Sequence, residues 1–284
     1  MLCHTIIEKM GAKMFKKVFR RIIFFLLMLI TCLGVYSICI EPSQIVVERI
    51  QLSTEGVMPE EVRIVQISDI HYSDIVGINK IQKAIQLVNA EKADVIVLTG
   101  DYITYDDSYF NELTEELRSL KAQYGIYAIW GNHDYCGNME GMRNRFEEIG
   151  VNMLVNENRY ISIGASGFWL IGVGSYYEND VDLQKAINNI PEQDMKILLC
   201  HEPDFVDNLS EAQVFLQISG HSHGGQVRLP LYGALKLPPL GERYPMGLYS
   251  VNENYLYTSR GLGETDYKVR FNCKPEITII TLKK

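Results

Sequence analysis

Between residues 62 and 150 the chain alternates short apolar runs with longer amphipathic segments. The short runs are rich in Val, Ile and Leu and end in polar residues, which is typical of strands buried in a parallel sheet. These strands are expected at 62–71, 94–101 and 126–134. In the segments between and after them, apolar residues recur at helical spacing, which predicts amphipathic helices. The helices are expected at 78–93, 110–125 and 139–150. This order predicts an α/β core with a mostly parallel, buried sheet.

After residue 151 the apolar runs come closer together, and only one further helix, around 182–189, is evident. The runs again have the composition of strands. They are expected at 159–164, 168–174, 196–202, 214–221, 255–261 and 276–282. We therefore expect a second sheet packed on the first.

The segment 22–40 has a different character, because its nineteen residues carry no charge. A helix of that length spans about 28 Å, close to the hydrocarbon core of a bilayer. A basic segment precedes it at 1–21, which by the positive-inside rule places the N-terminus in the cytoplasm and the rest of the chain outside. We expect a single-pass membrane anchor, with a cleaved signal peptide and secretion as the alternative. Residues 41–60 are then a tether, and 61–284 the folded domain.

The net charge of the folded domain excludes one class of function. Six of the 27 Lys and Arg and one of the 35 Asp and Glu lie in residues 1–40, so the remaining chain carries a net charge of −13. Such an acidic domain is expected to bind duplex nucleic acid poorly.

The six cysteines show no C-x-x-C spacing, and an odd number follow the apolar segment. We expect neither a disulfide framework nor a cysteine zinc site.

Five of the six histidines lie where a predicted strand ends, and acidic or amide residues accompany them. Ligands in open α/β sheets bind at the carboxyl ends of the strands. The residues concerned are Asp69, His71, Asp101, Asn132, His133, His201, His221 and His223. Oxygen and imidazole ligands without thiolates suit Mn²⁺, Fe or Zn²⁺.

Each of these motifs alone has a simpler explanation. Asp69 and His71 are compatible with a loop cap, Asp101 with a turn, and Asn132 with a helix N-terminus. The pair His221 and His223 is a weak signal by itself. Their occurrence together, each closing an apolar strand, favours a metal centre.

The motifs SDIH (68–71), TGD (99–101), GNHD (131–134), CHEP (200–203) and GHSHGGQ (220–226) resemble those of the calcineurin-like metallophosphoesterases. The similarity extends from about Val62 to Leu282 and is greatest to the bacterial membrane-associated phosphohydrolases. It implies a four-layer fold, with two packed mixed β-sheets flanked by helices, here preceded by one transmembrane helix.

The resemblance also implies the roles of the site residues. One metal ion would be held by Asp69, His71, Asp101 and His223. The second would be held by Asp101, Asn132, His201 and His221. Asp101 would then bridge two divalent ions of Mn, Zn or Fe, and His133 would be catalytic, as a general acid or as a stabiliser of charge. Gly224 and Gly225 are expected to let the backbone approach the site closely, because a side chain at either position would crowd the phosphate.

The implied reaction is hydrolysis of a phosphodiester or pyrophosphate bond by a hydroxide that bridges the two metals. An envelope or lipid-linked phosphate is the expected substrate, because the apolar, proline-rich segment 228–247 follows the last motif and is a candidate for a substrate wall facing the membrane. The alternatives are a phosphomonoesterase with the same site, a cytoplasm-facing pyrophosphohydrolase of the UDP-diacylglucosamine type, and a non-catalytic metal-binding scaffold.

Overall fold

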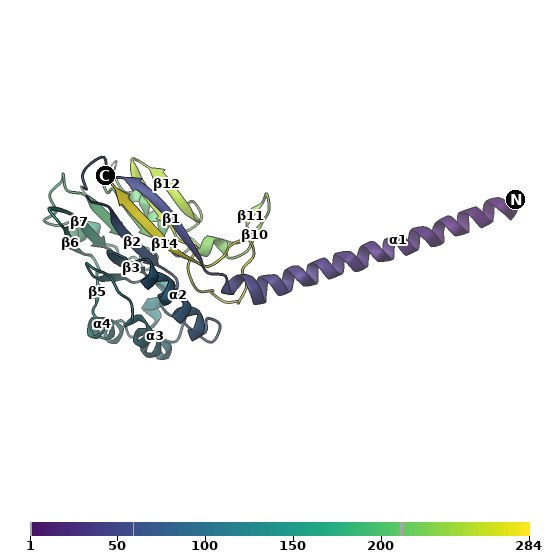
Figure 1. Ribbon diagram of the computed structural model, residues 1–284, viewed down its shortest axis with the longest axis horizontal. Coiled ribbons are helices and arrows are strands. Elements are labelled where there is room, and N and C mark those ends of the chain that lie inside the picture. The colour runs from purple at the N-terminus through teal and green to yellow at the C-terminus, as the bar shows by residue number, and fades with distance from the viewer. Residues whose placement is uncertain (1, 59, 211–212) are drawn as a thin grey trace.

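The computed structural model describes residues 2–58, 60–210 and 213–284, and it shows a long N-terminal helix extending from a two-sheet domain (Figure 1). Helix α1 (Leu2–Val35) continues through a π-helical turn, η1 (Tyr36–Ile40), and a 3₁₀ turn, η2 (Glu41–Ser43). The span Met14–Ser43 has a mean hydropathy of 2.6 in its most apolar window and is long and apolar enough to cross a membrane.

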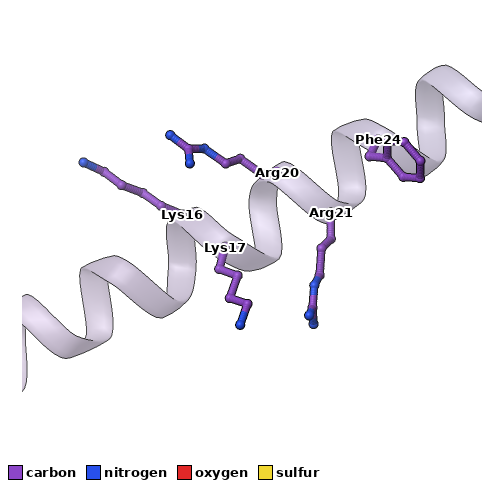
Figure 2. Close-up of a pocket in the computed structure, with 5 residues that line it drawn as sticks. All are labelled: Lys16, Lys17, Arg20, Arg21 and Phe24. Atoms are coloured by element: carbon purple, nitrogen blue, oxygen red, sulfur yellow. The ribbon is translucent and has the colours of Figure 1, made fainter.

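A cluster of basic side chains precedes the apolar part of α1. Figure 2 shows Lys16 and Arg20 pointing to one side of the helix and Lys17 and Arg21 pointing to the other. The helix therefore carries four exposed cations immediately before Ile22.

The first sheet has six strands in the order β1-β14-β2-β3-β4-β5. Their bounds are β1 (Val46–Ser53), β14 (Glu276–Lys283), β2 (Val62–Ile67), β3 (Val95–Thr99), β4 (Ile126–Ile129) and β5 (Val151–Met153). Strand β14 is antiparallel to β2, and the other neighbours in this sheet are parallel.

The second sheet also has six strands, in the order β12-β13-β9-β8-β7-β6. Their bounds are β12 (Gly247–Val251), β13 (Asn254–Thr258), β9 (Leu216–Ser219), β8 (Lys196–Leu199), β7 (Ser166–Gly172) and β6 (Glu157–Ile163). The pairs β12–β13 and β6–β7 are antiparallel and the three inner pairs are parallel. A separate two-stranded hairpin is formed by β10 (Arg228–Leu229) and β11 (Gly233–Ala234).

Alternation along the buried strands explains the layers. In β2, Ile64 packs between the two sheets, whereas its neighbour Val65 packs against the helices on the outer face. These helices are α2 (Ile78–Ala90), α3 (Phe110–Leu117) and α4 (Met139–Glu148), which lie on one side of the first sheet (Figure 1). Helix α5 (Leu183–Ala186) and the 3₁₀ turn η5 (Pro203–Asn208) cover the outer face of the second sheet through Ala186 and Phe205. The expected fold of two packed mixed sheets flanked by helices is confirmed.

Several segments differ from expectation in detail. The strand expected at 276–282 as part of the second sheet is β14, which lies between β1 and β2 in the first sheet. Residues 46–53, within the segment expected to be a tether, form β1 at the edge of the first sheet. The helix expected at 110–125 ends at Leu117, and residues 118–125 lead to β4 without helical structure.

The end of the apolar helix is fixed to the domain by buried contacts. The Ser37 carbonyl accepts a hydrogen bond from the Arg270 N–H at 2.9 Å. The Glu41 side chain, 1% exposed, accepts one from the Cys273 N–H at 2.5 Å. The base of α1 is therefore part of the packed structure.

The strand directions place the site end of the sheet beside this helix. Strand β1 starts three residues after η2, and β14 runs parallel to it. Because β2 is antiparallel to β14, and β3 and β4 follow β2, the carboxyl ends of β2, β3 and β4 lie at the end of the sheet from which α1 leaves.

Candidate metal centre

The polar residues predicted from the strand ends converge at one edge of the two sheets. Asp69 and His71 follow β2, and Asp101 follows β3. The 3₁₀ turn η4 (Asn132–Cys136) after β4 carries Asn132 and His133. His201 follows β8, and His221 and His223 follow β9, the latter opening the 3₁₀ turn η6 (His223–Gly225).

These residues form two ligand groups that share one carboxylate. Ligand atoms of Asp69, His71, Asp101 and His223 all lie within 4.8 Å of one another, as do those of Asp101, His201 and His221. All six residues are buried. Asp101 Oδ2 is 3.4 Å from His71 Nε2 and 3.1 Å from His201 Nε2, so it lies between the two groups.

Asn132 lies beside the second group. Its side-chain oxygen lies 2.9 Å from His221 Nδ1. His221 Nε2 is 2.8 Å from the Pro239 carbonyl and therefore carries the proton that donates to it. The Nδ1 lone pair and the amide oxygen thus face each other, which suits two ligands of one cation.

The ring of His201 is oriented in the same way by a backbone partner. Its Nδ1 lies 2.6 Å from the Thr99 carbonyl and must donate a hydrogen bond to it. Nε2 is then the unprotonated nitrogen, and it is a buried atom without a hydrogen-bond partner. Such a backbone carbonyl commonly fixes the tautomer of a metal-binding histidine.

Other buried polar atoms at the site also lack partners. Asp69 Oδ2 and His223 Nδ1 have none, and the Nε2 atoms of His71 and His223 lie only 3.1 Å apart. Buried polar atoms are normally satisfied. Carboxylates, imidazoles and an amide with unsatisfied atoms fit divalent metal ions, and this is the donor set that the sequence indicated.

The protonation of the cluster is strongly perturbed. Burial opposes ionisation of Asp101, but the facing His201 and His71 rings hold its pKa well below the usual range. Burial likewise opposes charge on His201, yet Asp101 and Asp69 raise its pKa well above the usual value. Burial, His71 and Arg270 lower the pKa of His223.

His133 stands beside these groups and is absent from both. Its backbone N–H donates to Asp101 Oδ1 at 2.9 Å, and its Nδ1 donates to the Thr104 carbonyl at 2.8 Å. The ring makes an edge contact with His71, with centroids 5.0 Å apart. Because Nδ1 donates to this carbonyl, Nε2 is the ring nitrogen without that backbone partner.

Backbone strain is concentrated at the site. Asp69, His71, Asp101, His221 and His223 all have φ between 48° and 68°. Non-glycine residues rarely adopt this conformation, and such strain gathers at functional sites. Gly220 allows the close packing beneath them, because a Cβ there would lie 1.9 Å from Ser68 Oγ and 2.2 Å from Asp69 Oδ2.

Gly224 and Gly225 both have left-handed backbone conformations and close protein neighbours. Their φ angles are 60° and 79°. A Cβ on Gly224 would lie 2.7 Å from Cys273 Sγ, and one on Gly225 would lie 2.5 Å from the Cβ of Ala234. These glycines thus let protein segments pack over the metal loop.

Sequence reasoning missed Asp134 as an organiser of the site. Its fully buried carboxylate accepts hydrogen bonds from the N–H groups of Gly131, Asp101 and Tyr102, at 2.8, 2.9 and 2.9 Å. It therefore fixes the loops after β3 and β4 to each other. The GNHD motif gave no sign that Asp134 connects the two loops, because its partners are backbone N–H groups, which every residue except proline has.

A cavity of about 450 Å³ opens over the metal-ligand side chains. Its floor is formed by Asp101, Asn132, His133, His221 and His223. Its walls come from the segment 235–239 and from three tyrosines: Tyr105, Tyr177 and Tyr267. Arg270 is fully buried against Glu264 and so does not reach this cavity as a phosphate ligand.

The chain is similar to known proteins over most of its folded domain. The calcineurin-like phosphoesterase family model matches residues 62–225. The metallophosphoesterase YkuE of Bacillus subtilis is 36% identical over 226 residues, which cover 78% of this chain and 79% of that protein. The phosphodiesterase YaeI of Escherichia coli is 32% identical over 225 residues, 78% of this chain and 82% of that protein. A transmembrane protein with a metallophosphoesterase domain from Danio rerio is 29% identical over 255 residues, 85% of this chain and 56% of that protein.

Proposed function

The chain belongs to the calcineurin-like phosphoesterase family, and we propose that it is a membrane-anchored phosphodiesterase or pyrophosphatase that acts on a lipid-linked or envelope phosphate. The observation that carries the proposal is the position of Asp101, whose carboxylate lies in both ligand groups. A carboxylate shared in this way is what a pair of adjacent divalent ions requires, because it screens their mutual repulsion.

The ligand assignment follows the two groups. Asp69, His71, Asp101 and His223 would hold one ion, and Asp101, Asn132, His201 and His221 the other. Two divalent ions of Mn, Zn or Fe would supply an acidified water to attack phosphorus and positive charge for the phosphoryl oxygens. In a domain with net charge −13 this local positive charge is what admits an anionic substrate.

His133 is assigned the proton-transfer or charge-stabilising role. The Thr104 carbonyl fixes its tautomer, and the Asp101 contact fixes its backbone. When the ring is in its imidazolium form, Nε2 carries the second proton at the cavity floor and can donate it to the leaving oxygen or stabilise charge on the phosphoryl group.

The contacts at the end of the apolar helix support an uncleaved anchor. Cleavage after Cys39 would remove Ser37, whose carbonyl accepts a hydrogen bond from Arg270, and would free the helix from the domain. The four cations at 16–21 support a cytoplasmic N-terminus and an extracytoplasmic domain. The similarity to a transmembrane protein of Danio rerio agrees with membrane association.

A lipid-linked substrate is supported by the direction in which the site faces. The carboxyl ends of β2, β3 and β4 lie at the end of the domain nearest α1, and Leu235 and Leu237 line the cavity above them. A phosphate at the membrane surface would therefore lie close to the metal centre. The similarity to the phosphodiesterase YaeI favours a diester over a monoester.

The test is a substrate panel with the full-length protein in detergent and added Mn²⁺. We expect cleavage of bis-p-nitrophenyl phosphate and of a pyrophosphate-linked lipid, with little cleavage of p-nitrophenyl phosphate. Turnover of the monoester alone would identify a phosphomonoesterase. A folded, metal-loaded protein that cleaves none of the three would be a metal-binding scaffold.

Orientation is tested separately in cells. Protease added to intact spheroplasts should digest the domain if it is extracytoplasmic. Protection of the domain until the membrane is opened would reverse the proposed orientation and favour a cytoplasm-facing pyrophosphohydrolase.

A further inference from the structure

The hairpin formed by residues 228–235 exposes four large apolar side chains within a short stretch. Leu231 is 110% exposed, Tyr232 74%, Leu235 54% and Leu229 41%. Contiguous exposed apolar side chains of this kind mark interaction surfaces. We refer to residues 228–235 as the apolar hairpin.

The tip of the apolar hairpin is held in a conformation that serves to expose its leucine. Leu231 has φ 67°, in the left-handed region that residues with a side chain seldom adopt. Pro230 precedes it and Gly233, with φ 89°, ends the turn. A strained leucine that is fully exposed among the residues that the structure describes indicates a partner outside the domain.

The apolar hairpin lies at the end of the domain from which α1 leaves (Figure 1). A short series of hydrogen bonds connects them. Phe271 donates to the Gln226 carbonyl and accepts from the Arg228 N–H, both at 2.9 Å, and the adjacent Arg270 N–H donates to Ser37 at the base of α1. The hairpin is therefore fixed beside the helix.

We propose that the apolar hairpin inserts into the surface of the bilayer that α1 spans, as a second membrane contact of the domain. The inference rests on the proposed anchoring by α1 and not on the proposed reaction. Leucine and tyrosine side chains are suited to the boundary between headgroups and acyl chains, where one end of the side chain is apolar and the other meets water. Lys236, which is exposed directly after Leu235, would reach lipid phosphates from the same place.

Insertion of the apolar hairpin would also fix the height of the active site above the membrane. Arg228 Nη1 donates to the Gly224 carbonyl at 2.8 Å, and the Leu235 N–H donates to the Val227 carbonyl at 3.0 Å. The hairpin thus packs on the loop that carries His223, and Leu235 forms part of both the hairpin and the cavity wall. A lipid phosphate could reach the cavity without leaving the headgroup layer.

The experiment measures membrane depth at the hairpin with a tryptophan. The chain has only Trp130, which is buried, and Trp169, in β7 of the second sheet, so an added tryptophan can be followed. Full-length Leu231→Trp and Tyr232→Trp variants are reconstituted in phosphatidylcholine vesicles with and without bromine on acyl carbons 6 and 7. The matched control is Val57→Trp, 56% exposed and beyond the end of β1 that lies away from α1.

We expect bromine to remove about half of the emission that the Leu231→Trp and Tyr232→Trp substitutions add, because an interfacial side chain sits about 5–10 Å into the headgroup and acyl boundary. The Val57→Trp variant should be quenched no more than the parent protein. Added emission that bromine leaves unchanged in both hairpin variants would overturn the proposal. A blue-shifted but unquenched emission would also overturn it, by placing the hairpin against protein. The measurement requires no turnover, so a failure of the proposed reaction would leave its result intact.

Discussion

The carboxylate of Asp134 accepts a hydrogen bond from the backbone N–H of Asp101 at 2.9 Å, and it thereby positions the one carboxylate shared by both ligand groups. The same carboxylate also binds the N–H groups of Gly131 and Tyr102. Three donors from two loops converge on a side chain that the solvent does not reach.

Asp134→Asn should weaken metal binding while leaving every ligand in place. An amide presents one oxygen instead of two and turns an NH₂ group toward backbone donors, so the loop of Asp101 must shift. We expect about a 10–100-fold loss of Mn²⁺ affinity, the usual effect of changing a residue that supports a ligand. Isothermal titration of the full-length protein measures it. Asp182→Asn, which alters an exposed helix cap, is the control, and an Asp134→Asn affinity equal to that of the control would refute the role.

His133→Ala should lower kcat and spare metal binding. The ring is close to the ligand groups but belongs to neither, and its tautomer leaves Nε2 for the substrate. A positioned proton donor typically contributes about 10²–10⁴-fold to the rate. Activity and bound metal are measured on the same sample. If metal content fell in parallel with kcat, His133 would be a ligand instead.

Gly220→Ala should damage the first ligand group. The new Cβ would lie 2.2 Å from Asp69 Oδ2, and the displaced carboxylate would no longer face His223, whose Nε2 is 3.4 Å from Asp69 Oδ1. Such overpacking costs about 1–3 kcal/mol of stability. Thermal unfolding and metal titration test both effects. Gly77→Ala is the matched control, because no atom lies within 4 Å of its added Cβ. Equal metal affinity in the two variants would be inconsistent with this packing.

Lys80 should make the domain more stable as the pH rises into the alkaline range. Burial lowers the pKa of Lys80 to about 8, although the Glu264 carboxylate at 2.6 Å opposes the shift. Between about pH 8 and 10.5 the unfolded chain then binds more protons than the native one, so the free energy of unfolding rises with pH. The gain is about 3 kcal/mol across that window.

The measurement is thermal unfolding in detergent from pH 7.5 to 10. Lys80→Met should remove most of the rise, and Lys121→Met, at an exposed position, should keep it. Identical pH profiles for the two variants would show that Lys80 ionises normally.

The sequence predicted the site residues best where a polar side chain directly follows an apolar strand. His201 and Asp101 were identified because each follows a continuous apolar run, and parallel strands bring their carboxyl ends to one edge. Ile64 and Val65 explain why those runs are continuous, since neighbouring residues of β2 pack on opposite faces of a buried strand.

Other features had no comparable signal. Strand β1 pairs with β14 more than 200 residues away, and half of its side chains are exposed, so the chain around Val46 has no buried-strand pattern. Asp134 accepts hydrogen bonds from backbone N–H groups, and Thr104 accepts one through its backbone carbonyl. Such partners are not recognisable from residue types. The crowding of Gly225 by Ala234 also had no signal, because only the tertiary fold brings these two residues together.

The central claim is that Asp101 holds two divalent ions that hydrolyse a phosphodiester. The most direct measurement is titration of Mn²⁺ into the metal-free, full-length protein, with bis-p-nitrophenyl phosphate hydrolysis followed on the same samples. We predict two equivalents bound per chain, hydrolysis that appears with them, and loss of both tight binding and hydrolysis in Asp101→Asn. Hydrolysis that persists in the Asp101→Asn variant, or a protein that reaches full activity with one equivalent, would contradict the account.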